Sequence, residues 1–179
     1  MMMEDLERVM FTKEQLANKI QAMGRIISQD YEGKDLVVVG ILKGAAIFTM
    51  DLVRAITCPA RLDFMVVSSY GDGTSSSGVV KIRKDLETDI KGKDVLICED
   101  IIDSGITMKN LFPMLMKREP ASLRLCALLS KPSRREVDVN IDYLGWEVPD
   151  AFLVGYGLDY AERYRNLPLI GVLKREIYV

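Results

Sequence analysis

The sequence contains no histidine, and this absence restricts the chemistry open to the chain. It excludes Ser-His-Asp and Cys-His catalysis and any metal site built on imidazole. Acid–base steps must then fall to carboxylates, lysines or tyrosines. Any bound metal is expected to be a hard cation held by oxygen ligands.

Cysteines and long apolar runs are also scarce. Cys58, Cys98 and Cys126 are odd in number, widely spaced and set in apolar surroundings, which is typical of buried free thiols in a reducing compartment. Charged residues interrupt every apolar segment before the roughly 18 residues that a membrane span needs, and the N-terminus has no signal-like pattern. We therefore expect a cytoplasmic protein without a membrane partner.

What the chain does contain is the composition of an ordinary globular protein. Its 179 residues are 49% hydrophobic and 28% charged, with a formal net charge of −2. This length favours one well-packed domain spanning residues 1–179. The charge gives no reason to expect a nucleic-acid partner.

Segments typical of strands and helices alternate along the chain. Thr12 to Gln15 fits a capping box, and apolar residues then recur on one face, which predicts a helix at about residues 13–29. Further helices are predicted at 45–56 and 107–117. Strands are predicted at 35–42, 61–70, 79–86, 95–102, 123–129, 141–146, 151–158 and 169–173, with one helical turn near 161–164. This alternation predicts an α/β fold with a mostly parallel central sheet flanked by helices.

The strongest motif is VLICEDIIDSGIT at residues 95–107. An apolar strand leads into two adjacent acids, Glu99 and Asp100, and then into a small polar turn that opens a helix. Backbone N–H groups and the hydroxyls of Ser104 and Thr107 can bind a phosphate at such a helix start. From the residues alone, an N-cap with a solvated acidic turn is an equally good interpretation. The adjacent acids favour a ligand site, because they repel a phosphate unless they bind its sugar hydroxyls or an accompanying cation.

This segment resembles the phosphoribosyl-pyrophosphate signature of type I phosphoribosyltransferases, in the EDIIDTGxT form shared by the hypoxanthine-guanine enzymes. Ser104 stands where that form usually has Thr, which keeps the hydroxyl, and Asp103 is an acid that pyrimidine-type relatives usually lack. The resemblance implies the type I phosphoribosyltransferase fold, with Asp103 as the general base or proton acceptor near purine N7. It implies a phosphate and ribose site made of Glu99, Asp100, Asp103, Ser104, Gly105, Ile106 and Thr107.

Other segments extend the resemblance over nearly the whole chain. The sequence Leu-Lys-Gly at residues 42–44 is similar to the family's pyrophosphate loop, in which the Leu-Lys peptide bond is often cis. The polar segment at about residues 69–80 looks like the family's flexible lid, which closes through Tyr70. The residues that the resemblance assigns to pyrophosphate are Leu42, Lys43, Gly44, Ser69, Tyr70 and Arg165. Without the resemblance they would be an ordinary turn, an ordinary loop and a surface arginine.

The purine site is implied by two further similarities. Lys131 is similar to the lysine that binds the 6-oxo group in this family, and residues 151–165 resemble the family's hood segment. In that segment Phe152 would stack on the purine, Leu153 would offer backbone groups to its edge, and Asp159 would hold a second Mg²⁺. Taken without the resemblance, Lys131 is a solvated surface lysine and Phe152 a core residue.

The resemblance also implies what the protein binds and how it is organised. Mg²⁺ would be the cofactor, with Glu99, Asp100 and Asp159 as ligands, and the substrates would be phosphoribosyl pyrophosphate and a 6-oxopurine, hypoxanthine or guanine. A hood subdomain would be built mainly from about residues 140–179 plus N-terminal residues. The family usually forms homodimers or homotetramers.

Other functions fit parts of the sequence. An RNA-binding regulator of pyrimidine genes with the same fold predicts a basic face and a pyrimidine-type signature, against which the net charge of −2 and Asp103 both argue. A nucleotide-binding domain without activity is disfavoured because all parts of the site are present together. An enzyme that prefers xanthine stays open, whereas Lys131 disfavours adenine because an ammonium donor suits a 6-oxo acceptor.

Overall fold

The computed structural model describes residues 2–69 and 80–179 of the chain. In chain order the elements are β1 (Leu6–Phe11), α1 (Lys13–Asp30), β2 (Leu36–Ile41), α2 (Ala46–Ala55), β3 (Ala60–Ser69), β4 (Val80–Lys84), β5 (Asp94–Ile102), α3 (Ile106–Met116), β6 (Ser122–Ser130), the 3₁₀ turn η1 (Pro132–Arg134), β7 (Tyr143–Glu147), β8 (Leu153–Val154), β9 (Ile170–Leu173) and α4 (Arg175–Tyr178).

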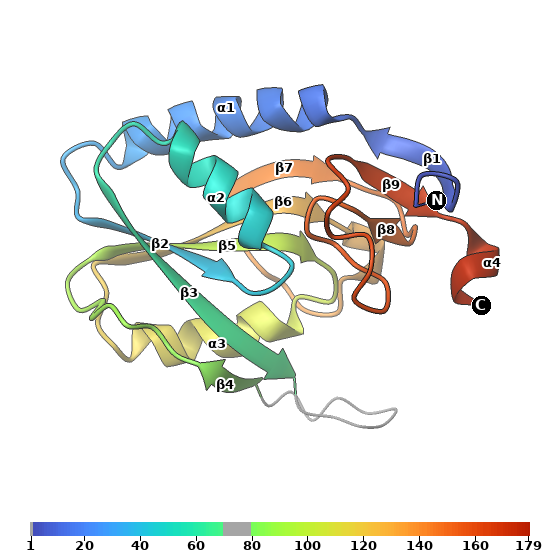
Figure 1. Ribbon diagram of the computed structural model, residues 1–179. Coiled ribbons are helices and arrows are strands. Elements are labelled where there is room, and N and C mark those ends of the chain that lie inside the picture. The colour runs from blue at the N-terminus through green and yellow to red at the C-terminus, as the bar shows by residue number, and fades with distance from the viewer. Residues whose placement is uncertain (1, 70–79) are drawn as a thin grey trace.

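The central sheet has six strands in the order β4-β3-β2-β5-β6-β7. All neighbours are parallel except β3 and β4, which pair antiparallel. Helices α1 and α2 cover one face of this sheet and α3 covers the other (Figure 1). The predicted α/β class with a mostly parallel sheet is therefore confirmed.

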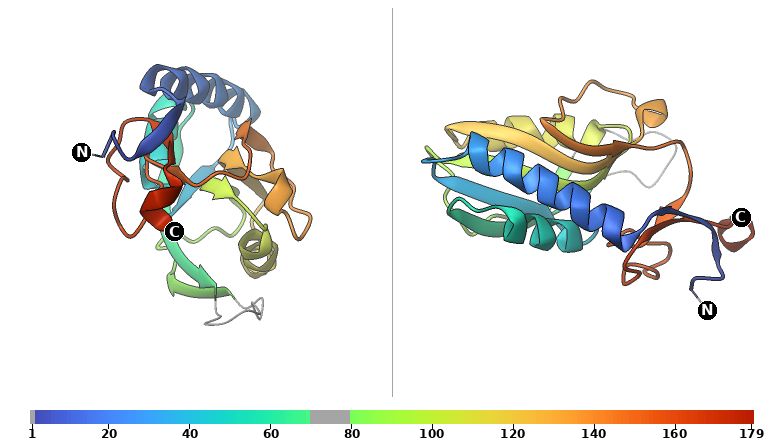
Figure 2. Two further views of the ribbon diagram at one scale, coloured as in Figure 1. Left: turned by 90° about the vertical axis from the view of Figure 1, so that its right-hand side faces the viewer. Right: turned by 90° about the horizontal axis from the view of Figure 1, so that it is seen from above.

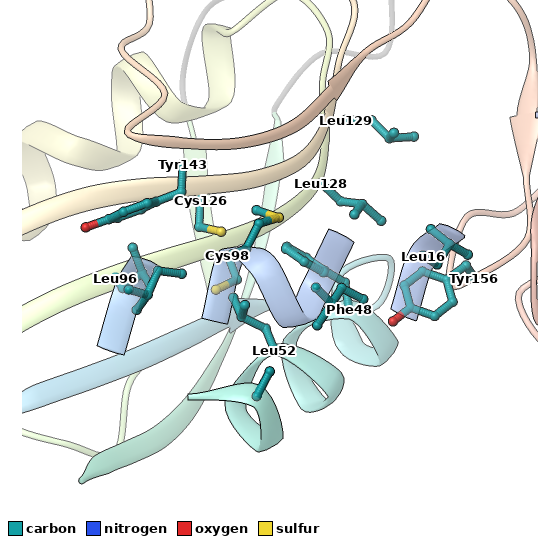
Figure 3. Packing of buried hydrophobic residues seen from close by; sticks show 14 of the residues in the cluster. Leu16, Phe48, Leu52, Leu96, Cys98, Cys126, Leu128, Leu129, Tyr143 and Tyr156 are labelled. Atoms are coloured by element: carbon teal, nitrogen blue, oxygen red, sulfur yellow. The ribbon is translucent and has the colours of Figure 1, made fainter. Parts of the chain in front are cut away.

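The alternation of side chains along the central strands divides the core into two layers. On β5, Leu96 and Cys98 lie in the cluster that contains the apolar residues of α1 and α2. The neighbouring Val95 and Ile97 lie in the cluster that contains the apolar residues of α3. Figure 3 shows the first layer, in which residues from α1, α2 and the strands pack together. A strand buried on both faces explains why β2 and β5 are continuously apolar.

Helix α1 begins where the sequence predicts it. Thr12 and Gln15 form the expected reciprocal capping box, with the Thr12 amide donating to Gln15 Oε1 at 2.8 Å and the Gln15 amide donating to Thr12 Oγ1 at 3.2 Å. All three cysteines are free; Cys98 and Cys126 are buried as expected, whereas Cys58 is half-buried. Within residues 2–69 and 80–179, no helix is long and apolar enough to cross a membrane.

A second, antiparallel sheet has the order β1-β9-β8 and is built from N-terminal residues and residues within 140–179, the segments that the family resemblance assigns to a hood subdomain. It lies at the end of the central sheet toward which β2, β5, β6 and β7 point, with both chain termini beside it (Figures 1 and 2). Strand β1 was missed altogether, because its partner β9 is distant in the sequence and no local pattern indicates the pairing. The small sheet places residues 151–165 over the carboxyl ends of the central strands.

Two predictions for the last third of the chain are wrong. The helical turn predicted near residues 161–164 is a tight turn in which Ala161, Glu162 and Tyr164 have positive φ values of 50°, 63° and 75°. The strand predicted at 151–158 is reduced to Leu153–Val154. Beyond it the chain reverses, and a side chain at Gly157 would meet the Gly44 carbonyl oxygen at 2.2 Å. Close packing against residues 42–44 therefore overrides the local propensity. The short helix α4 was also missed.

Candidate active site

Loops that carry the candidate residues follow the carboxyl ends of β2, β5 and β6. Open α/β sheets bind ligands at this edge. After β5, residues 103–107 border a cavity of about 210 Å³, which is lined by Glu99, Ile101, Ile102, Asp103, Ser104, Gly105, Thr107 and Met108. Five of the residues predicted for phosphate and ribose, Glu99, Asp103, Ser104, Gly105 and Thr107, thus line one small cavity, whereas Asp100 and Ile106 are not part of its lining.

The start of α3 at this cavity is suited to an anion. Gly105 occupies the N-cap with a φ of 84° and makes no side-chain cap hydrogen bond. Ser104 Oγ accepts from the Ile106 amide at 3.3 Å. Backbone N–H groups and the positive end of the helix dipole therefore lie at the cavity together with the hydroxyl-bearing residues Ser104 and Thr107.

The loop after β5 is held in place by the segment after β6. The Arg135 guanidinium donates from Nε to the Asp103 carbonyl at 3.0 Å and from NH2 to Ser130 Oγ at 2.7 Å. The amides of Glu136 and Val137 both donate to the Ser104 carbonyl, at 3.0 and 3.2 Å. Sequence reasoning missed Arg135, because the contact joins residues more than 30 positions apart.

Replacing Arg135 by methionine is expected to loosen this loop. Loss of the two hydrogen bonds should lower the free energy of unfolding by about 1–2 kcal/mol and speed hydrogen exchange at residues 104–107 by about tenfold. Hydrogen exchange with mass spectrometry measures the local effect. The matched control is Arg61→Met, which removes an exposed ion pair with Asp35 and should leave the loop unchanged. Equal exchange rates at residues 104–107 in R135M and the wild type would contradict the assignment.

Glu99 and Asp100 place two acidic side chains beside each other at the end of β5. Glu99 is buried and Asp100 is half-buried. Burial raises the pKa of Glu99 well above its usual value, and the neighbouring Asp100 charge raises it further. Burial also raises the pKa of Asp100. Such a pair destabilises the fold unless a cation neutralises it, so its presence is best explained by a ligand.

Replacing Glu99 by glutamine should therefore stabilise the protein in the presence of a metal chelator. Removing one of two acids that share a buried site is expected to raise the Tm by about 2–4 °C. Differential scanning calorimetry measures the shift. Glu87→Gln is the control, because the Glu87 side chain is 84% exposed and its removal should change the Tm little. An unchanged or lower Tm for E99Q would contradict the interpretation.

The loop at residues 42–44 lies against Asp100 on one side and against residues 157 and 162 on the other. The Leu42-Lys43 peptide bond is cis. A side chain at Gly44 would lie 1.9 Å from Asp100 Oδ2, so only glycine allows this approach. Lys43 Nζ forms an ion pair with Glu162 Oε2 at 2.7 Å.

Arg165 lies at the same junction. Its guanidinium donates to the Gly157 carbonyl at 2.7 Å and pairs with Asp159 and Glu162, each at 3.1 Å. Its buried Nε has no hydrogen-bond partner among the described residues. Lys43 and Arg165 are therefore brought together by one carboxylate, that of Glu162, which the sequence did not single out.

A second cavity, of about 410 Å³, lies beside the first. It is lined by Ile101, Asp103, Lys131, Arg134, Asp150, Ala151, Phe152, Leu153, Leu158, Asp159 and Tyr178. All four residues predicted for the purine, Lys131, Phe152, Leu153 and Asp159, line it. The Lys131 side chain is only 12% exposed, and its Nζ lies 3.9 Å from both Asp103 Oδ1 and Asp150 Oδ1. Lys131 is therefore not the solvated surface lysine that is expected when the resemblance is left aside.

Aromatic rings form one wall of this second cavity. Phe152 stacks on Tyr178 with ring centroids 4.6 Å apart and meets the edge of Tyr160 at 5.5 Å. Sequence reasoning missed Tyr178 and Asp150, because neither belongs to a recognisable motif.

Some of the predicted site residues lie outside the described part of the chain, and the predicted metal ligands Glu99 and Asp159 lie at different cavities. Tyr70 and the loop at 71–78 lie outside the described residues, and Ser69 is described only as the last residue of β3. Asp159 lines the second cavity and pairs with Arg165, whereas Glu99 lines the first. Across the described part of the chain, no group of three or more His, Cys, Asp or Glu side chains is arranged to hold a metal by itself.

The chain is similar in sequence and in structure to proteins of known family. Residues 11–161 match the family described as phosphoribosyl transferase domain. The chain is 49% identical over 178 residues to the hypoxanthine-guanine phosphoribosyltransferase of Bacillus subtilis, covering 99% of both chains. It is 51% identical over 177 residues to a bifunctional TilS/HprT protein of Listeria monocytogenes, covering 99% of this chain but only 27% of that protein. A crystal structure of a Staphylococcus aureus hypoxanthine phosphoribosyltransferase superimposes with a TM-score of 0.97 at 49% identity, covering 99% of this chain and 97% of the other.

Proposed function

The chain belongs to the phosphoribosyl transferase family and has its type I fold, and we propose that it is a hypoxanthine-guanine phosphoribosyltransferase. It would convert hypoxanthine or guanine and 5-phosphoribosyl 1-pyrophosphate to IMP or GMP and pyrophosphate. The observation that carries this proposal is that the two cavities adjoin: Ile101 and Asp103 line both. One cavity suits a sugar phosphate and the other a planar base, so the new bond would form where they meet.

The donor would occupy the first cavity and the junction beside it. Its 5-phosphate would bind the amides and hydroxyls of residues 103–107, and its ribose hydroxyls would lie at Glu99 and Asp100. Its pyrophosphate would lie near Lys43 and Arg165. The pyrophosphate would then replace the Glu162 carboxylate, which both cations contact in the structure.

The base would occupy the second cavity, where its ring stacks on Phe152. Lys131 would donate to the 6-oxo group, which supports a 6-oxopurine over adenine. N9 would attack the anomeric carbon as the bond to pyrophosphate breaks, and Asp103 would accept the proton released at N7. The backbone of Leu153 and the side chain of Asp159 would lie at the edge of the ring.

The residues present fit a divalent cation. Glu99 and Asp100 supply hard oxygen donors, and in the described part of the chain neither carboxylate forms an ion pair with an arginine or lysine. These two residues would hold Mg²⁺ together with the donor, and Asp159 would hold a second ion. Bound there, Mg²⁺ would supply charge neutralisation for the departing pyrophosphate.

A cytoplasmic location and a homodimeric or homotetrameric state belong to the same proposal. The free cysteines support a reducing compartment. The oligomeric state rests on the family resemblance alone. The lid proposed at about residues 69–80 would exclude water from the activated donor during transfer.

The proposed function is tested by a purine panel. Purified protein is incubated with phosphoribosyl pyrophosphate and Mg²⁺ and with hypoxanthine, guanine, xanthine or adenine, and nucleoside monophosphate is measured by chromatography. We expect IMP and GMP with equal amounts of pyrophosphate, and little AMP. Preference for xanthine would support the alternative specificity, whereas no product with any base and binding of RNA on filters would support the regulator.

A further inference from the structure

Tyr178 is the one aromatic residue of the second cavity that no motif assigned. It lies in the single helical turn α4, which follows β9 directly. The turn is held to the chain just before β1, because the Lys174 amide donates to the Asp5 carbonyl at 2.9 Å. Ile177 and Tyr178 also pack against a cluster formed by Leu6, Val154, Tyr164, Leu167 and Leu173. Figure 1 shows α4 continuing from β9 beside the N-terminal segment. The position of the Tyr178 ring is therefore set by the fold.

The ring of Tyr178 restrains the ring of Phe152. The two stack with an interplanar angle of 27° at 4.6 Å, and Tyr160 meets both rings edge-on, at 5.5 Å from Phe152 and 6.4 Å from Tyr178. Offset stacks and edge contacts are the preferred arrangements of aromatic pairs. Phe152, itself only partly buried, is thus held from two directions.

This restraint bears directly on the base, because Phe152 and Tyr178 line the same cavity as Asp103 and Lys131. A planar base stacks more favourably on a ring that already keeps a fixed plane, because a ring free to rotate would lose conformational entropy when the base binds. Outside the aromatic contacts, the Tyr178 side chain makes no hydrogen bond to another described residue. Tyr178 therefore acts on Phe152 through its aromatic ring and not through its hydroxyl group.

We propose that Tyr178 is a positioning residue for the base: by stacking on Phe152 it fixes the plane on which the purine stacks, and so sets the affinity for the base independently of the donor. This inference rests on the proposed function. It concerns the base half of the site alone, since neither Tyr178 nor Phe152 lines the cavity at residues 103–107.

The test compares Tyr178→Leu, which removes the ring, with Tyr178→Phe, which keeps it. Y178L should raise the KM for hypoxanthine about three- to tenfold, with the KM for phosphoribosyl pyrophosphate unchanged, whereas Y178F should match the wild type. The control Ile177→Val trims the neighbouring side chain of α4 and should change neither KM. Calorimetric titration with GMP should show the same loss of affinity in Y178L only.

Three results would overturn the proposal. An unchanged hypoxanthine KM in Y178L would show that the stack is irrelevant to the base, and a lower KM would show that Tyr178 obstructs the site. Equal increases in the KM values for base and donor would indicate general loosening rather than positioning. The wild type is assayed in parallel, so a wild-type protein that forms no IMP refutes the proposed function itself, whereas an active wild type with an unaffected Y178L refutes only the role of Tyr178.

Discussion

Replacing Asp103 by asparagine is expected to lower kcat for hypoxanthine by about 10²- to 10⁴-fold, while the KM for phosphoribosyl pyrophosphate changes little. Asparagine has nearly the same shape but cannot accept the proton from purine N7. The loop should keep its conformation, because Arg135 holds it through the Asp103 carbonyl oxygen and not through the side chain. Steady-state kinetics with each substrate varied in turn measures both parameters.

Asp150→Asn provides the matched control for this substitution. Its carboxylate lies 3.9 Å from Lys131, at the same distance as that of Asp103, and both side chains are 50% exposed. Loss of either negative charge should affect Lys131 similarly, so the excess loss of turnover in D103N reports the proton transfer. Comparable losses of turnover and donor binding in D103N, or equal kcat values in D103N and D150N, would refute the role of Asp103.

Replacing Lys131 by methionine should reduce kcat/KM for hypoxanthine and guanine by about 10- to 150-fold, as expected for loss of a hydrogen bond worth about 1.5–3 kcal/mol to a charged donor. Methionine keeps the length of the apolar stem. Because the ammonium group is nearly enclosed between two carboxylates, it cannot be replaced easily by water. The KM for the donor should stay the same, since Lys131 lines the second cavity, which we propose binds the base.

The activity of K131M with adenine distinguishes a lysine that selects the base from one that only stabilises the site. A lysine that selects a 6-oxo group should, when removed, narrow the preference for hypoxanthine over adenine. The control is Lys109→Met, an exposed lysine on α3, which should not alter the preference. A K131M enzyme with the same ratio of hypoxanthine to adenine activity as the wild type would contradict the assignment.

The central fold could be predicted because its signals are local. Buried parallel strands give continuous apolar runs such as 36–41, and the capping box at Thr12 marks the start of α1. The loop that we propose binds phosphate could be recognised equally well, because its strand, adjacent acids, small polar turn and helix follow one another within residues 95–107.

The parts of the structure that the sequence does not predict depend on contacts between residues that are distant in the chain. Residues 161–164 include good helix formers, yet the turn around Glu162, which pairs with Lys43 and Arg165, takes positive φ values instead. Strand β1 exists only because β9 pairs with it. The stack of Tyr178 on Phe152 likewise has no local signature. In each case tertiary packing decides a conformation that neighbours in sequence leave open.

The proposed site is tested most directly by a crystal structure of the protein with phosphoribosyl pyrophosphate and Mg²⁺. We expect the 5-phosphate on the amides at the start of α3, the ribose diol beside Glu99 and Asp100, and the anomeric carbon at the junction of the two cavities next to Asp103. Donor density elsewhere on the protein, or a phosphate that does not touch residues 103–107, would contradict it.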